Sequence, residues 1–274
     1  MINIKKLLIA IVSSVTLLST SALADRVSTY LTGALQDASA VKSALSGAGF
    51  EVLSSSAVNK AGDLTTVVFT CPTLKAAASK EGKGFAGVLR VLVNQKDGEI
   101  SVTNPVYFNN AYLQDSFDAA AATKVLDKIN AALPGLTSSD DGMDVGDLKG
   151  YHFMMGMPYY DDMATVGEGS HADLLAKVKA YKGGKNVVFE LSLGADSTLI
   201  GYKIGKKTAK FIKKIGTKNA SVLPYSILIE GGKAKILAPK YYLALGYPSL
   251  SMSQFMTIAT VPGAIEKDCA KAFK

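Results

Sequence analysis

The sequence contains little of the chemistry on which most enzymes depend. Two histidines and two cysteines occur in 274 residues. The sequence has no glycine-rich phosphate loop followed by Lys-Ser or Lys-Thr, no closely spaced cysteine pair and no Gly-x-Ser-x-Gly turn. We therefore expect a protein that is not an enzyme, and the sequence offers no set of catalytic residues.

The two cysteines are too few to build a disulfide framework. Cys71 and Cys269 stand far apart in the sequence, and their pairing stays open. Cys71 ends an apolar run just before Pro72, where a proline can open a helix and the helix N-terminus would stabilise a thiolate. The alternative is a small buried side chain at a strand end.

Long apolar runs are confined to the first 24 residues. Two lysines precede the apolar residues 7–18, and the small residues of Ala22-Leu23-Ala24 follow. This pattern predicts a secretory signal peptide cleaved after Ala24, and thus a periplasmic protein. The apolar run is shorter than the roughly 20 residues that cross a bilayer. We expect no membrane-spanning segment.

Charged residues are sparse and mildly positive in balance. They make up 19% of the sequence, while apolar residues make up 48%, a composition typical of a folded chain. The net charge of +7 falls to about +5 without the two lysines of the signal peptide. In an exported protein this positive balance favours lipid head groups, cell-wall anions or small anionic ligands as binding partners over nucleic acid.

One pattern occurs twice. Residues 91–105, VLVNQKDGEISVTNP, and residues 227–239, ILIEGGKAKILAP, both consist of an apolar run, a polar turn with glycine, an alternating run and a proline. In both, the last glycine precedes the proline by seven positions. Beyond the proline, Tyr107 and Tyr241 coincide. Repetition of this length indicates a duplicated unit.

The surrounding segments follow a common order. In the first copy we expect a strand at 26–31, a helix at 37–46, a hairpin of 50–58 with 64–71 and a helix from Phe117. In the second copy we expect a strand at 151–157, a helix at 172–181, a hairpin of 187–193 with 198–203, a lysine-rich helix at 203–218 and a helical stretch from Phe255. This order predicts an α+β fold of two similar tandem units, each an antiparallel sheet with helices packed on one face. The units are residues 25–136 and 148–274, joined by a polar linker at 137–147.

Residues 49–105 also resemble a known family. GFEVLSSSAV, TVVFTCP and the hairpin closed by Pro105 resemble the bacterial domain-of-unknown-function family numbered 302, and residues 199–211 and 222–239 resemble its later part. The resemblance implies a small α+β fold and no established activity. Many members carry two cysteines in one site, whereas this chain keeps only Cys71 in the first copy. The second copy has Tyr202 and Tyr225 near the two cysteine positions, which does not support two-thiol chemistry.

Two groups of side chains are candidates for binding. Tyr202, Tyr225, Tyr241 and Tyr242 lie on or beside the second expected sheet, where they would hold a small ligand in a groove or else form the contact between units. Residues 203–218 carry seven lysines and no acid. Ile204, Thr208, Phe211 and Ile215 recur at helical spacing and mark the packed face, opposite Lys206, Lys210, Lys213 and Lys214. Those lysines form either a solvated face or a weak, salt-sensitive surface for anionic lipid or polyanion.

His152 and Met154 provide an alternative reading. Imidazole and thioether are soft ligands that suit cuprous copper, and both residues would share one side of the strand expected at 151–157. Core packing explains the same residues without a metal.

The sequence thus predicts a non-enzymatic small-ligand-binding or protein-interaction module. A pocket is expected between the units or on the tyrosine-rich sheet. The alternative is metal (copper) or thiol-redox handling through His152 with its neighbouring methionines or through Cys71. The sequence is compatible with a monomer or a homodimer.

Overall fold

The computed structural model describes residues 26–274, which form antiparallel sheets and helices in an α+β fold, as predicted. The signal-peptide prediction lies outside the described residues. We call residues 26–147 the first half and residues 148–274 the second half.

The first half contains a six-stranded antiparallel sheet with the order β3-β4-β5-β6-β2-β7. Its strands are β2 (Tyr30–Ala34), β3 (Glu51–Ala57), β4 (Leu64–Thr70), β5 (Leu89–Asn94), β6 (Glu99–Thr103) and β7 (Thr137–Ser138). The β3–β4 and β5–β6 hairpins are the two predicted from the sequence. They form because apolar residues alternate on either side of a polar turn.

The second half contains a five-stranded sheet with the order β10-β11-β12-β13-β9. Its strands are β9 (Ala164–Glu168), β10 (Val187–Gly194), β11 (Ser197–Tyr202), β12 (Tyr225–Glu230) and β13 (Lys233–Ile236). In both sheets the four hairpin strands lie in chain order, and the strand that precedes them in the chain lies beside the last. Both β3 and β10 also contain a register shift, at Val52/Ser54 and at Val187/Phe189. The two sheets therefore share one strand order, and duplication of a unit stays a prediction from the sequence.

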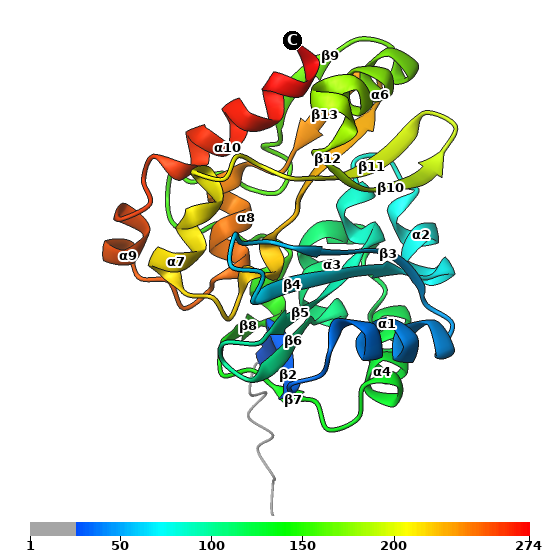
Figure 1. Ribbon diagram of the computed structural model, residues 1–274, viewed down its shortest axis with the longest axis vertical. Coiled ribbons are helices and arrows are strands. Elements are labelled where there is room, and N and C mark those ends of the chain that lie inside the picture. Colours follow the sequence, from blue (N-terminus) through cyan, green and yellow to red (C-terminus); the bar gives the residue numbers. More distant parts are fainter. Residues whose placement is uncertain (1–25) are drawn as a thin grey trace, which may run out of the picture.

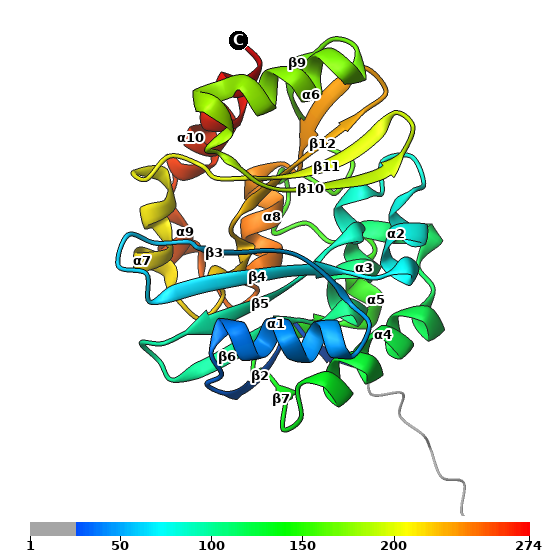
Figure 2. The same ribbon diagram turned by 45° about the vertical axis from the view of Figure 1, so that its right-hand side comes forward.

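Helices flank the two sheets and separate them (Figures 1 and 2). The helix α1 (Ala38–Gly47) and the helix α4 (Ala119–Ala132) cover the outer face of the first sheet. The helix α6 (His171–Ala180) and the helix α10 (Val261–Ala270) lie beyond the second sheet. In addition to these, α3 (Pro105–Leu113) and α8 (Pro239–Gly246) lie between the sheets.

The remaining elements are short. They are β1 (Arg26–Ser28), α2 (Pro72–Ala78), η1 (Gly84–Gly87), η2 (Gln114–Ser116), β8 (Gly142–Asp144), α5 (Val145–Leu148), η3 (Tyr181–Gly184), η4 (Thr208–Phe211), α7 (Ile212–Ile215), η5 (Ala220–Val222), α9 (Met252–Met256) and η6 (Lys271–Phe273).

The central strands of the first sheet are buried on both faces, so their apolar residues belong to two cores. On β5, Leu89, Val91 and Val93 belong to the outer core beneath α1 and α4. The intervening Leu92 belongs to the central core, which joins both halves and includes Tyr107 and Ile227. The inner faces of both sheets are apolar, and each is buried against the other half in the central core.

Two tyrosine hydrogen bonds join α3 and α8 in a reciprocal manner. Tyr107 is the third residue of α3, and its hydroxyl donates to the carbonyl of Leu245 at 3.0 Å. Tyr241 is the third residue of α8, and its hydroxyl donates to the carbonyl of Ala111 at 3.3 Å. Each acceptor lies four residues after the opposite tyrosine, so the two helices are related by a local twofold arrangement.

Three expectations need correction. The strand expected at 151–157 is wrong, because that segment forms turns, with the Met157 N–H donating to the carbonyl of Met154. Its apolar side chains, among them Tyr151 and Phe153, pack against the central core from a loop, and β9 supplies the strand instead. The lysine-rich helix is also shorter than expected: only η4 and α7 are helical, and Gly216 with φ of 113° ends the helix.

The expected linker, residues 137–147, contains two strands: β7 lies at the edge of the first sheet, and β8 belongs to a separate two-stranded sheet. The strand β7 pairs with β2, and β8 pairs with β1. The polar composition of this segment reflects its exposure at a sheet edge.

We expect Tyr107→Phe and Tyr241→Phe each to lower the free energy of unfolding by about 0.5–1.5 kcal/mol, because each removes a buried hydrogen bond between the two helices. Urea unfolding of the protein checks this. The matched control is Tyr159→Phe, which changes a half-exposed tyrosine and should shift stability by about 0.5 kcal/mol or less. Equal effects at all three positions would contradict the structural role of the reciprocal bonds.

Candidate functional site

A cleft of about 470 Å³ opens between the two halves. The first half contributes the end of β3 and the turn after it, residues 56–60. The second half contributes Val188 on β10, the segment of residues 203–213, and Leu223-Pro224 just before β12. Segments from the two halves, far apart in the sequence, therefore form opposite walls.

The cleft combines an apolar floor with a basic rim. Val58, Ile204, Ile212 and Leu223 are buried side chains of its lining. Six lysines line it as well: Lys60, Lys203, Lys206, Lys207, Lys210 and Lys213. No acidic residue is part of this lining. Positive charge therefore surrounds an apolar floor that could contact an apolar group of a ligand.

The lysine-rich wall is held in place by Asp268 of α10. Its Oδ2 accepts hydrogen bonds from the Gly205 N–H at 2.9 Å and from the Thr208 hydroxyl at 2.6 Å, and its Oδ1 accepts one from Lys271 at 2.9 Å. Burial alone would raise the pKa of Asp268, but the bonds from Thr208, Lys271 and Gly205 together hold that pKa below its ordinary value. The carboxylate thus anchors the start of the segment that carries the lysines.

The structure brings three of the four predicted lysines to this cleft. Lys206, Lys210 and Lys213 line it, whereas Lys214 donates to the carbonyl of Thr257 at 3.2 Å and is not part of the lining. The packed face of the segment matches the expectation, since Ile204 and the other apolar residues at helical spacing turn inward.

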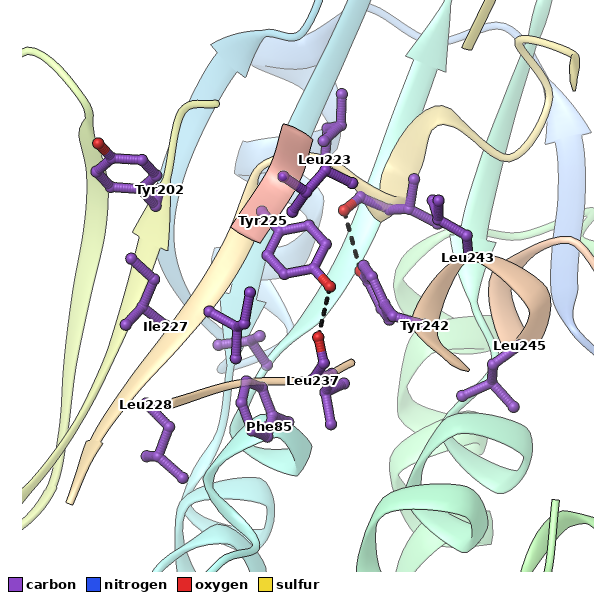
Figure 3. Packing of buried hydrophobic residues seen from close by; sticks show 14 of the residues in the cluster. Phe85, Tyr202, Leu223, Tyr225, Ile227, Leu228, Leu237, Tyr242, Leu243 and Leu245 are labelled. Atoms are coloured by element: carbon purple, nitrogen blue, oxygen red, sulfur yellow. Dashed lines mark hydrogen bonds between the residues drawn. The ribbon is translucent and has the colours of Figure 1, made fainter. Parts of the chain in front are cut away.

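The four predicted tyrosines are buried in the core and none lines this cleft; Figure 3 shows Tyr202, Tyr225 and Tyr242. Their hydroxyls all donate to backbone carbonyls. Tyr225 bonds Leu237 at 2.7 Å, and Tyr242 bonds Val222 at 3.0 Å. Tyr202 reaches the carbonyl of Asp268 at 3.4 Å, and Tyr241 bonds α3 as described above. Burial raises the pKa of all four phenols, which therefore stay neutral and serve as internal hydrogen-bond donors.

The two cysteines are free and buried in different places. Cys71 belongs to the outer core beneath α1 and α4, where it precedes α2. Cys269 belongs to the central core, and burial raises the pKa of its thiol. Neither thiol is exposed, as a reactive cysteine would be.

His152 and Met154 lie in the loop that replaces the expected strand. The His152 ring packs against Tyr159, with 4.4 Å between ring centroids, and Met154 and Met155 are exposed. Within residues 26–274, no group of three or more histidine, cysteine, aspartate or glutamate side chains is arranged to hold a metal ion. The geometry adds no support to the copper alternative.

A second cleft of about 500 Å³ has a lining that mixes apolar side chains with charges of both signs. It contains Glu99, Asp140 and Asp141 together with Lys218. Part of its polar surface is already paired within the protein, since Asp141 accepts from Asn219 at 3.0 Å. The lysine-lined cleft is the better candidate because its charge has one sign and its floor is apolar.

Comparisons with protein-family models, with curated proteins and with solved structures found no match to this chain. Among the helices of residues 26–274, none is both long and apolar enough to cross a membrane, as expected.

We expect both thiols to be inert in the folded protein. Ellman's reagent should find no fast-reacting thiol without denaturant and two thiols per chain in guanidinium chloride, because both side chains are buried and unpaired. A rapidly reacting native thiol would revive the redox reading, and loss of both thiols under denaturing conditions would reveal a disulfide.

We expect Asp268→Asn to lower the free energy of unfolding by about 1–2 kcal/mol near neutral pH, because a neutral amide accepts weaker hydrogen bonds. The pKa of Asp268 is lower in the folded protein than its ordinary value of 3.8. The stabilisation by the carboxylate is therefore complete well above pH 3.8 and is lost as the pH falls through the folded pKa.

Urea unfolding of the protein and the variant, near neutral pH and again below pH 3.8, measures this effect. The stability difference should shrink at the lower pH. The exposed Asp196→Asn is the control, with a difference near zero at both. A difference for Asp268→Asn that does not depend on pH would show that its carboxylate is not the anchor.

Proposed function

We propose that this protein binds an amphiphilic organic anion in the lysine-lined cleft and acts on it by binding alone. The ligand class is an apolar chain or ring system that carries a carboxylate or phosphate at one end. The observation that supports this proposal is the coexistence, in one cleft, of an apolar floor and six lysines without an acidic neighbour.

The dimensions and charges of the cleft suit such a ligand. Small-molecule sites commonly measure about 300–1,000 Å³ and are largely apolar with a few polar groups that fix orientation. Burial of apolar surface, worth about 25 cal/mol per Å², would supply most of the affinity. The lysines are exposed, so each contributes little by itself, but together they select against neutral and cationic head groups.

A binding role also agrees with the groups that line the cleft. Its lining contains no histidine, cysteine, aspartate or glutamate that would act as a general base or as a nucleophile. Export to the periplasm and relationship to domain family 302 remain proposals that rest on the sequence, and both are compatible with a carrier of exported or cell-envelope amphiphiles.

The experiment compares three ligands that share one chain and differ in head-group charge. Dodecanoate, dodecanol and dodecyltrimethylammonium, each below its micelle concentration, compete against the fluorescent anion anilinonaphthalene sulfonate on the mature protein. Dodecanoate should displace the probe at least about tenfold more effectively than either of the others, and added salt should reduce this preference. Equal displacement by all three ligands would overturn the proposal.

Charge reversal locates the site. The double variant Lys206→Glu and Lys210→Glu should weaken dodecanoate binding by about tenfold or more, because both side chains line the cleft. Lys214→Glu, on the neighbouring turn and outside the lining, is the matched control and should bind within about twofold of the unmodified protein. Equal losses in both variants would indicate a diffuse basic surface.

A further inference from the structure

A second site follows from an arginine that has no acidic partner. Arg26 and Arg90 are the two arginines of the sequence. Arg26 is exposed, whereas Arg90 on β5 retains only 5% of its accessible surface. Its side chain points to the inner face of the first sheet, toward the second half.

The guanidinium of Arg90 is poorly satisfied by the protein. Its Nη2 donates to the Ser226 hydroxyl at 2.8 Å, and its buried Nε has no hydrogen-bond partner within residues 26–274. In that same range, the ion pairs all involve lysines, so no carboxylate lies within 4.0 Å of this charge. A buried guanidinium with five donors and no counter-charge is costly, and an anion that completes its shell lowers that cost.

A cavity of about 10 Å³ opens beside Arg90 at the junction of the halves. Its lining consists of Phe85, Arg90, Tyr112, Tyr225, Ser226, Leu237 and Tyr242. Two of the phenol groups, on Tyr225 and Tyr242, already donate to carbonyls. Burial raises the pKa of Tyr112 and Tyr242, and Arg90 is the positive group that counteracts this shift in both, which places its charge close to them.

We propose that this cavity binds a single halide ion, chloride under ordinary conditions, with the Arg90 guanidinium as its charged donor. The cavity of about 10 Å³ has room for one small occupant, which favours a monatomic anion over acetate or phosphate. A water molecule would accept a hydrogen bond from the guanidinium but would leave its charge uncompensated, whereas a halide ion accepts the bond and compensates the charge.

The position of the site gives the ion a role in joining the halves. Arg90 lies four residues before Asn94, where β5 turns, and Ser226 lies four residues before Glu230, where β12 turns. The two residues therefore occupy equivalent places in their sheets and meet across the junction. An ion at this point should stabilise the association of the two sheets, independently of any ligand in the lysine-lined cleft.

Thermal melting tests the proposal. The melting temperature of the mature protein is measured against sodium chloride, bromide and gluconate, with ionic strength held constant. Chloride and bromide should produce a saturable rise of about 2 °C or more over gluconate, because they bind only the folded state. Arg90→Met should lose this dependence, and the Lys206→Glu, Lys210→Glu variant should keep it, which separates this site from the cleft.

Anomalous diffraction of crystals soaked in bromide decides the case if Arg90→Met fails to fold. A bromide peak within hydrogen-bonding distance of the Arg90 guanidinium supports the site. A water molecule there without anomalous signal, or a melting temperature that does not distinguish halide from gluconate, overturns it.

Discussion

The structure depends on burial of the inner faces of two sheets against each other. The central core contains side chains from both halves, and α3 and α8 fill the space between the sheets. Because apolar burial is not directional, it brings the halves together without fixing their angle. The reciprocal bonds of Tyr107 and Tyr241 supply the directional contacts, since each hydroxyl reaches one carbonyl on the opposite helix. Both clefts and the cavity at Arg90 lie along this junction, so their shapes follow from its geometry.

Much of each half could be predicted from local patterns. The hairpins and α1, α4 and α6 have clear alternation or helical spacing, and they occur where expected. The helices α3 and α8 were not predicted, because nearly every residue of each is buried, which leaves no polar face to mark a helical period. The loop at residues 151–163 was misread for a related reason: its tyrosine and phenylalanine are needed to cover the core, and a loop covers it as well as a strand.

The candidate site could be predicted only in part, because its two walls come from distant segments. The lysines of residues 203–213 are visible as a charge run, and three of those selected do line the cleft. The opposite wall, residues 56–60, carries no unusual composition, and nothing local connects it with the lysines. The tyrosines were correctly placed near the second sheet, but the carbonyls that occupy their hydroxyls belong to tertiary neighbours such as Leu237. Arg90 was visible as a lone charge in an apolar run, yet its lack of a partner is a property of the folded chain.

The local twofold arrangement of α3 and α8 relates the lysine-lined cleft to a second place at the junction, where the structure is closed. There, the segment that follows β4 meets the second sheet directly. A Cβ on Gly84 would approach Leu228 to 2.4 Å, and one on Gly87 would approach Leu191 to 3.1 Å, so the absence of side chains at these glycines permits close contact. The segment after β4 therefore packs closely on the second sheet at Gly84 and Gly87, whereas the lysine-rich segment after β11 leaves a cleft beside the first sheet. Of these two places along the junction, the one at Gly84 and Gly87 is closed by direct contact and the one beside residues 203–213 is hollow, so a repeated strand order does not bring a repeated vestibule.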